Sequence, residues 1–223
     1  MNDMQPGDFS SSSPNQNSHL VNILLSPSLI ADARSKNPTL FNNFRQDSIL
    51  TELTDWCFTS KYKKHPQHDI ISKNAVSVLL SSPISLIQFL IESKLYSKLL
   101  YNFLLSDDSK IPILCTHFTQ VLSTQINVGT PLLFKNYPKI QKHLLNRIDV
   151  LAIRILIHLL VCSDADHINS EQMVNDLTSL ADENSDENAL YLISMIYKTV
   201  KKDSKFKTLF NNSSVLNHLI SAA

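Results

Sequence analysis

The residues best suited to bind a metal ion lie in two short stretches of the chain. The stretch KKHPQHD contains His65, His68 and Asp69, which offer two imidazoles and a carboxylate. Structural zinc sites usually include cysteines at short spacing, whereas this stretch contains Pro66 and no cysteine, so an exposed loop is the alternative interpretation. CSDADH, residues 162–167, also collects ligand types, but Ser and Asp there can equally end a helix and begin a turn. The sequence therefore predicts no metal site and no cofactor.

Thiol chemistry would require a cysteine beside a base. Cys115 and His117 are two residues apart, so on a helix their side chains point in different directions. The three cysteines, Cys57, Cys115 and Cys162, are far apart in the chain. An odd, scattered set without a secretory signal favours reduced, buried thiols in the cytoplasm. No serine stands in a recognisable nucleophile motif, so the sequence predicts no catalytic residue and a protein that is not an enzyme.

Glycine is almost missing from the chain. Gly7 and Gly129 are the only two, where average usage would give roughly fifteen. Phosphate-binding loops, dinucleotide folds and nucleophile elbows all require glycines at fixed positions, so these motifs are excluded. Hairpin-rich sheets need glycine as well. The formal net charge is zero, so no general basic field attracts nucleic acid.

The stretch LLNRIDVLAIRILIHLLVC, residues 144–162, is apolar but interrupted by charge. Arg147, Arg154 and His158 recur at i, i+7 and i+11 and form a narrow polar side. Its longest charge-free run, residues 155–163, is about half of the ~20 residues that a membrane span needs, so a span is excluded. The three polar residues either extend from a buried helix to solvent or line a concave surface. We predict that they contact a partner protein.

The apolar residues of the same stretch form two stripes. Two stripes on one helix predict that neighbouring helices cover it on two sides, as in a stacked helical array. One stripe contains Ile148, Ala152, Ile155, Leu159 and Cys162, and the other contains Ile153, Ile157 and Leu160.

Helical periodicity recurs along the chain, whereas strict alternation of apolar and polar residues does not. Ser26, Asn37, Ser82 and Thr130 each precede a proline, which predicts a capping side chain followed by proline in the first helical position. We predict an all-α fold, an irregular HEAT/armadillo-like solenoid of antiparallel helix pairs over residues 19–222, after a disordered polar tail at 1–18. The predicted helices are 19–25, 27–36, 38–44, 46–59, 68–81, 83–91, 93–106, 110–127, 130–136, 138–147, 149–163, 170–182, 186–202, 204–211 and 213–222.

The order of several segments is familiar. LVNILLSPSLIADARSKNPTLFNNFRQDSILTELTDWC is followed by SKNAVSVLLSSPISLIQFLIES and IPILCTHFTQVLSTQI. The stretch at 144–162 comes next, and EQMVNDLTSLADENSDENALYLISMIYKTVK after it. In order and pattern these segments resemble the SAPS domain, which is found in regulatory subunits of the serine/threonine protein phosphatase 6 type. The resemblance covers residues 19–222.

The resemblance implies a non-catalytic helical scaffold that binds a phosphatase 6-type catalytic subunit and directs it to substrates. It also implies a further scaffold subunit as a partner, and a location in the cytoplasm or additionally the nucleus. Neither nucleic acid nor membrane is expected as a partner. The alternatives are a generic HEAT/armadillo-type adaptor with another protein partner, and an all-helical enzyme whose site the sequence does not reveal.

Overall fold

The computed structural model describes residues 18–163, 167–184 and 186–200. Within these ranges every regular element is a helix, so the predicted all-α class is confirmed. The elements are α1 (His19–Leu24), α2 (Leu29–Arg34), α3 (Pro38–Phe44), α4 (Asp47–Phe58), α5 (His68–Leu80), α6 (Ile84–Glu92), α7 (Lys94–Leu105), the 3₁₀ helix η1 (Asp107–Lys110), α8 (Pro112–Ile126), α9 (Leu132–Asn136), α10 (Ile140–Leu145), α11 (Leu151–Cys162), α12 (Ser170–Asn184) and α13 (Glu187–Val200).

The predicted helix boundaries agree with the observed ones to within two residues at each end. The short 3₁₀ helix η1 was not predicted. Helices 204–211 and 213–222, and residues 1–17 of the predicted tail 1–18, lie outside the described residues. Ser18, predicted as the end of the tail, caps α1 by accepting a hydrogen bond from the Val21 amide.

The predicted role of proline at helix starts is confirmed at only one of four positions. Asn37 accepts a hydrogen bond from the Thr39 amide at 3.0 Å, and Pro38 is the first residue of α3. Pro83 and Pro131 instead occupy the capping position, with extended ψ angles of 157° and 140°. The fixed φ of proline suits either position, and here the extended ψ delays each helix by one residue. Pro27 lies before the cap of α2.

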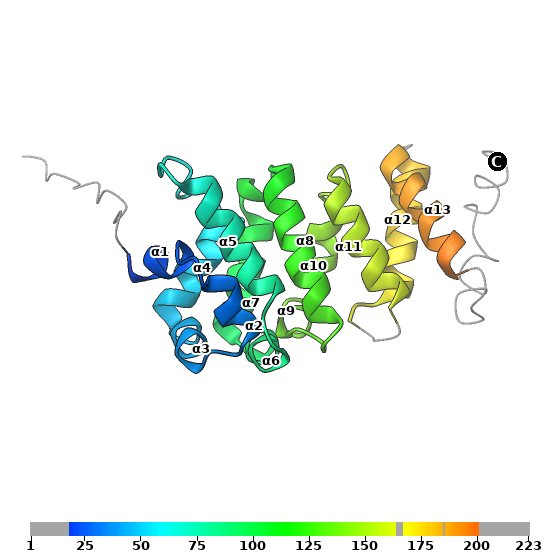
Figure 1. Ribbon diagram of the computed structural model, residues 1–223. Helices are drawn as coiled ribbons and strands as arrows, with labels where there is room; N and C mark the ends of the chain where they lie inside the picture. The colour runs from blue at the N-terminus through cyan, green and yellow to red at the C-terminus, as the bar shows by residue number, and fades with distance from the viewer. Residues whose placement is uncertain (1–17, 164–166, 185, 201–223) are drawn as a thin grey trace, which may run out of the picture.

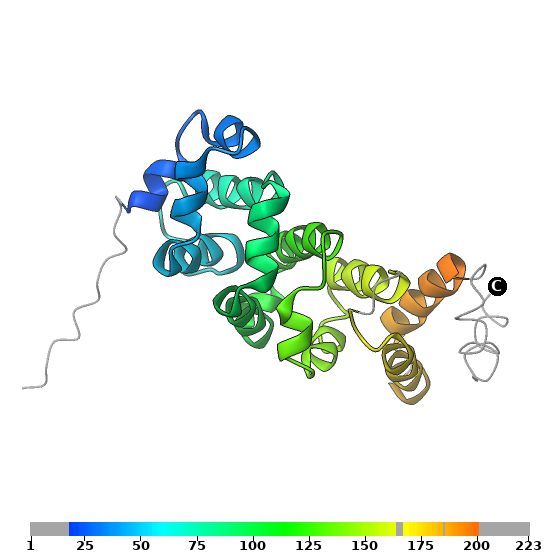
Figure 2. The ribbon, with the colours of Figure 1, turned by 90° about the horizontal axis from the view of Figure 1, so that it is seen from below.

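The helices follow one another along an elongated molecule, with α1 and α13 at opposite ends of the described part (Figure 1). Helices α5, α8, α11 and α13 pack side by side in that order. Behind them α4 packs on α7, and α7 packs on α9 and α10. Contacts of α4 with α5 and α8 join these two groups of helices. Helix α12 packs chiefly on α13, the last helix of the first row. Figure 2 shows the same succession from below, with several helices seen nearly end-on.

One hydrophobic core holds both rows together. Its buried side chains form a single cluster that extends from Leu20 to Ile196. Near the middle, the rings of Phe58, Phe103 and Phe118 lie with centroids 5.0 to 6.0 Å apart, a spacing typical of favourable aromatic contacts. The described helices therefore form one packed unit, which fixes the relative positions of the surfaces considered below.

Candidate interaction surface

Helix α11 lies between two neighbours in its row. It packs against α8 on one side and against α13 on the other, with a smaller contact to α12. Its buried side chains are Ile153, Leu156, Ile157, Leu160 and Val161. The predicted stripe of Ile153, Ile157 and Leu160 is therefore buried, as expected.

The second predicted stripe is buried only in part: Ala152 and Cys162 are half-buried against the core, whereas Ile155 and Leu159 are exposed. Leu151, which was not part of the predicted stripe, is exposed as well, and Leu151, Ile155 and Leu159 keep 55%, 41% and 38% of their residue surface exposed. Their spacing of i, i+4 and i+8 places them on one side of the helix. Ile148, at the start of that stripe, is buried. The reason is geometric: α8 and α13 flank α11, and no described helix covers its outward side.

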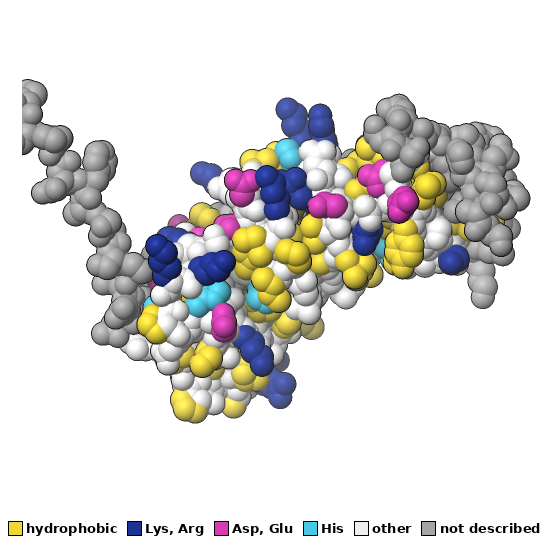
Figure 3. All heavy atoms as spheres, turned by 90° about the horizontal axis from the view of Figure 1, so that it is seen from above, with side chains coloured by type: hydrophobic (Ala, Val, Ile, Leu, Met, Phe, Trp, Pro, Cys, Tyr) yellow, Lys and Arg dark blue, Asp and Glu magenta, His cyan; other side chains and the backbone are white. Residues whose placement is uncertain are grey.

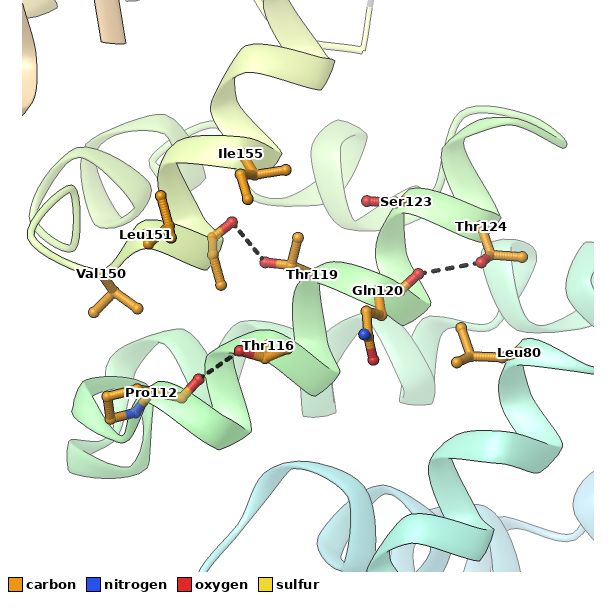
Figure 4. Close-up of a pocket in the computed structure, with 11 residues that line it drawn as sticks. Leu80, Pro112, Thr116, Thr119, Gln120, Ser123, Thr124, Val150, Leu151 and Ile155 are labelled. Atoms are coloured by element: carbon orange, nitrogen blue, oxygen red, sulfur yellow. Dashed lines mark hydrogen bonds between the residues drawn. The ribbon is translucent and has the colours of Figure 1, made fainter. Parts of the chain in front are cut away.

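An open groove adjoins this outward side (Figure 4). It has a volume of about 750 Å³ and runs from the end of α5 across α8 to the start of α11. Leu151 and Ile155 form one wall, and Leu80, itself 37% exposed, lies at the opposite end. The groove is lined by Leu80, Pro112, Thr116, Thr119, Gln120, Ser123, Thr124, Val150, Leu151, Ala152 and Ile155. None of these side chains is charged.

The threonines of the groove are used within the fold. Thr119 donates its hydroxyl hydrogen to the Ala152 carbonyl at 3.0 Å and so joins α8 to α11. Thr116 and Thr124 donate to the backbone carbonyls of Pro112 and Gln120 within α8, at 2.9 and 3.1 Å. The three threonine hydroxyls are therefore already hydrogen-bonded, and most of the exposed surface of the groove is apolar, which suits a mostly apolar ligand surface. We call the outward side of α11 together with this groove the α11 surface.

Arg154, predicted to contact a partner, joins α11 to α13. Its Nη1 donates to Oδ1 of Asn188 and to the carbonyl of Ile148, the latter at 3.2 Å. Its guanidinium carbon lies 5.8 Å from the ring centroid of Tyr191, within the range of a cation–π contact. The Nε atom is buried without an acceptor in the described part of the chain.

His158 and Arg147 also have partners within the fold. Nε2 of His158 lies 2.8 Å from Oγ1 of Thr199 on α13, and burial lowers the pKa of this imidazole. Arg147 precedes α11 and donates from Nε to the hydroxyl of Ser109 at 3.0 Å. The three residues of the predicted polar side therefore contact two different elements: Arg154 and His158 contact α13, and Arg147 contacts η1. Partner contact by Arg147, Arg154 and His158 stays a prediction.

The two histidines of the KKHPQHD stretch pack around a tryptophan. The rings of His65 and His68 lie 5.4 and 6.0 Å from that of Trp56. Nδ1 of His65 accepts from the Gln67 amide at 3.2 Å, and Nδ1 of His68 lies 3.1 Å from a carboxylate oxygen of Asp69. Among the described residues, no three His, Cys, Asp or Glu side chains are grouped closely enough to hold a metal ion.

The cysteines occupy environments that suppress thiolate formation. Burial raises the pKa of the Cys57 thiol well above its usual value and those of Cys115 and Cys162 to about 11. Cys115 donates to the Ser109 carbonyl at 3.0 Å, whereas His117 is directed at the carbonyl of Cys57, 3.1 Å away. Since the thiolate is the reactive species, all three are poor nucleophiles at neutral pH.

Charge on the molecular surface is mixed. Figure 3 shows, from above, Lys and Arg, Asp and Glu, and hydrophobic side chains interspersed on one face. No single helix in the described ranges is long and apolar enough to cross a membrane. Helices α5 and α6 together would be long and apolar enough, but the chain bends by 99° between them.

The exposure of the α11 surface was not predicted, although the i, i+4, i+8 spacing of its apolar residues is visible in the sequence.

Comparison of the chain with protein-family models, with curated proteins and with solved structures gave no match.

Proposed function

We propose that this chain is a non-catalytic regulatory subunit that binds a phosphatase 6-type catalytic subunit through the α11 surface. The helices would form an irregular solenoid that presents this surface to the partner. The observation that supports the proposal most is the exposed apolar side of α11, which has Leu151, Ile155 and Leu159 outward in the middle of a packed row.

The energetics favour a protein partner at this surface. Side chains left half exposed lose part of their burial free energy, and covering each of the three would contribute on the order of 1 kcal/mol. The uncharged groove beside them adds contact area without requiring a charge to be desolvated. Apolar side chains exposed together in this way mark protein interaction sites more often than scattered single ones do.

The partner is proposed from the resemblance to the SAPS domain, in the order of segments over residues 19–222. Such a subunit performs no bond chemistry. It would raise the effective concentration of the phosphatase near chosen substrates. The protonated thiols support the non-catalytic role, because they are poor nucleophiles.

The test is co-expression of the full chain with the phosphatase 6-type catalytic subunit of the same organism, followed by size-exclusion chromatography and titration calorimetry. We expect a stoichiometric complex. Ile155→Asp combined with Leu159→Asp should weaken it by about a hundredfold or more, because two apolar contacts would be replaced by charges that must be desolvated.

Ile84→Asp combined with Leu105→Asp is the matched control. These residues are also exposed, at 63% and 51%, but they lie on α6 and α7. Equal weakening by both variants would reject the α11 surface as the binding site. The absence of any complex with the unaltered chain would reject the partner and leave the generic adaptor as the second candidate, for which the uncharged groove suits an apolar peptide.

A further inference from the structure

A long section of the chain contains positive charge and no negative charge. Between Asp108 and Asp149 there is no Asp or Glu, although the chain as a whole is neutral. The cations of this section are Lys110, Lys135, Lys139, Lys142 and Arg147. The section includes α8, α9 and α10, so the excess falls on a defined part of the fold.

Three of these lysines are exposed and have no carboxylate partner among the described residues. Lys135 is in the last turn of α9, Lys139 lies in the turn after it, and Lys142 is in α10. Lys110 and Lys61, by contrast, form ion pairs with Asp107 and Asp55 at 2.7 and 2.6 Å. Helix dipoles favour Lys135 and Lys142, which are near helix C-termini, but the dipoles do not cancel the charge that faces solvent.

An ordered aromatic pair lies beside these lysines. The rings of Tyr101 and Tyr137 are stacked, with centroids 4.1 Å apart and planes inclined by 13°. The hydroxyl of Tyr101 lies 3.2 Å from Nε2 of His143, which fixes the pair against α10. Lys98 is three residues before Tyr101 on α7 and so lies on the same side of that helix.

Neighbouring cations affect the pKa of His143. Burial lowers the pKa of His143 first, and the charges of Lys142, Arg147 and Lys139 lower it further. No carboxylate contributes in the opposite direction. Lys142, Arg147 and Lys139 therefore act on His143, which contacts Tyr101, although Asp107 also interacts with Arg147.

We propose that Lys135, Lys139, Lys142, Tyr101 and Tyr137 form a second docking surface, which binds an acidic peptide segment of a partner protein. We call it the basic–aromatic surface. Carboxylates spaced along an extended peptide would pair with the three lysines, and the stacked tyrosines would supply rigid contact area at low cost in side-chain entropy. The proposal does not depend on the partner proposed for the α11 surface.

A peptide fits these observations better than a nucleic acid does. Nucleic-acid binding depends on neutralising many phosphates, and here the excess charge is confined to one section of a neutral chain. The aromatic part of this surface is also a single stacked pair, Tyr101 and Tyr137. Single-stranded nucleic acids usually stack on a series of aromatic side chains.

The test uses the full chain and a fluorescently labelled oligoglutamate peptide, with binding followed by anisotropy at low and at physiological salt. We expect saturable binding that Lys135→Glu, Lys139→Glu and Lys142→Glu together weaken by about tenfold or more. Lys63→Glu, Lys64→Glu and Lys73→Glu together are the control, because they change the net charge equally at exposed positions of another region. Circular dichroism and thermal melting establish that both variants fold.

Three outcomes would overturn the proposal. One is no saturable binding of oligoglutamate by the unaltered chain. Another is equal weakening by both triple variants, which would mean that binding follows net charge alone. The third is tighter binding of oligothymidylate than of oligoglutamate, lost in the Lys135/Lys139/Lys142 variant, which would assign the surface to nucleic acid.

Discussion

The α11 surface and the basic–aromatic surface belong to the same packed unit but present opposite chemistry. On α11 the exposed side chains are aliphatic, and the adjoining groove carries no charge. Around α9 and α10 three exposed lysines have no carboxylate partner within the described ranges, and they lie beside a stacked tyrosine pair. Aliphatic burial is insensitive to salt, whereas attraction between exposed charges is screened over about 10 Å. The two proposed surfaces would therefore hold their partners, or two parts of one partner, by different forces.

The largest expected difference between the two surfaces is in how strongly salt weakens binding. Raising ionic strength from low to about 0.5 M should weaken oligoglutamate binding by about tenfold or more, because screening removes most of the attraction. Binding of the phosphatase catalytic subunit at the α11 surface should change by less than about threefold over the same range. Anisotropy and calorimetry in a salt series measure both effects on the same preparation.

Testing each surface variant against the ligand of the other surface controls this comparison. The Ile155→Asp/Leu159→Asp chain should bind oligoglutamate as the unaltered chain does, and the Lys135/Lys139/Lys142 variant should retain the catalytic subunit. A single acidic partner that spans both surfaces would contradict the separation, since each variant would then weaken both interactions.

Arg154 and Arg147 should differ in their effect on stability. Replacing Arg154 by Met removes the hydrogen bond to Asn188 that joins α11 to α13, and also the one to the Ile148 carbonyl just before α11. We expect the free energy of unfolding to fall by about 1–3 kcal/mol. Arg147→Met removes contacts to Ser109 and Asn146 at a more open position and should cost about 1 kcal/mol or less. Urea denaturation followed by circular dichroism measures both.

The same two variants test the partner contact predicted from the sequence. A weaker complex with unchanged stability in either variant would support a direct contact of that arginine with the partner. Lower stability with an unchanged complex would assign the residue to the fold alone. Equal costs for the two variants would contradict the distinction between a bridging and a peripheral arginine.

Most of the helical pattern was predictable from the sequence, because it depends on local periodicity. The boundaries of α4, α5 and α7 follow from apolar spacing and short connections. The start of α6 was less predictable, because Pro83 can occupy either the cap or the first turn.

The surfaces were less predictable, because periodicity identifies apolar sides without identifying what covers them. Ile155 and Ile157 have similar sequence surroundings, but Ile157 is fully buried and Ile155 is not. Arg154 meets Asn188 across 34 residues, and Tyr101 meets His143 across 42. The absence of acids between Asp108 and Asp149 is visible in the sequence, but the juxtaposition with Tyr101 depends on the packing of α7 on α9 and α10.

Acid should weaken the fold near both surfaces, and this is the smallest effect expected. The pKa values of His158 and His143 are lowered by burial, and for His143 also by neighbouring cations. The folded protein therefore binds protons at these sites less readily than the unfolded chain does. Their contribution to stability is complete above the ordinary histidine pKa of about 6.5 and is lost as pH falls through the lower folded values.

His158→Gln should make the decline of stability below that pH shallower, because one group that opposes protonation in the folded state is removed. His19→Gln is the control, since His19 is an exposed residue of α1. Urea denaturation in a series of buffers measures the slope of unfolding free energy against pH for each chain. A slope unchanged by His158→Gln would mean that the contact with Thr199 tolerates the protonated ring.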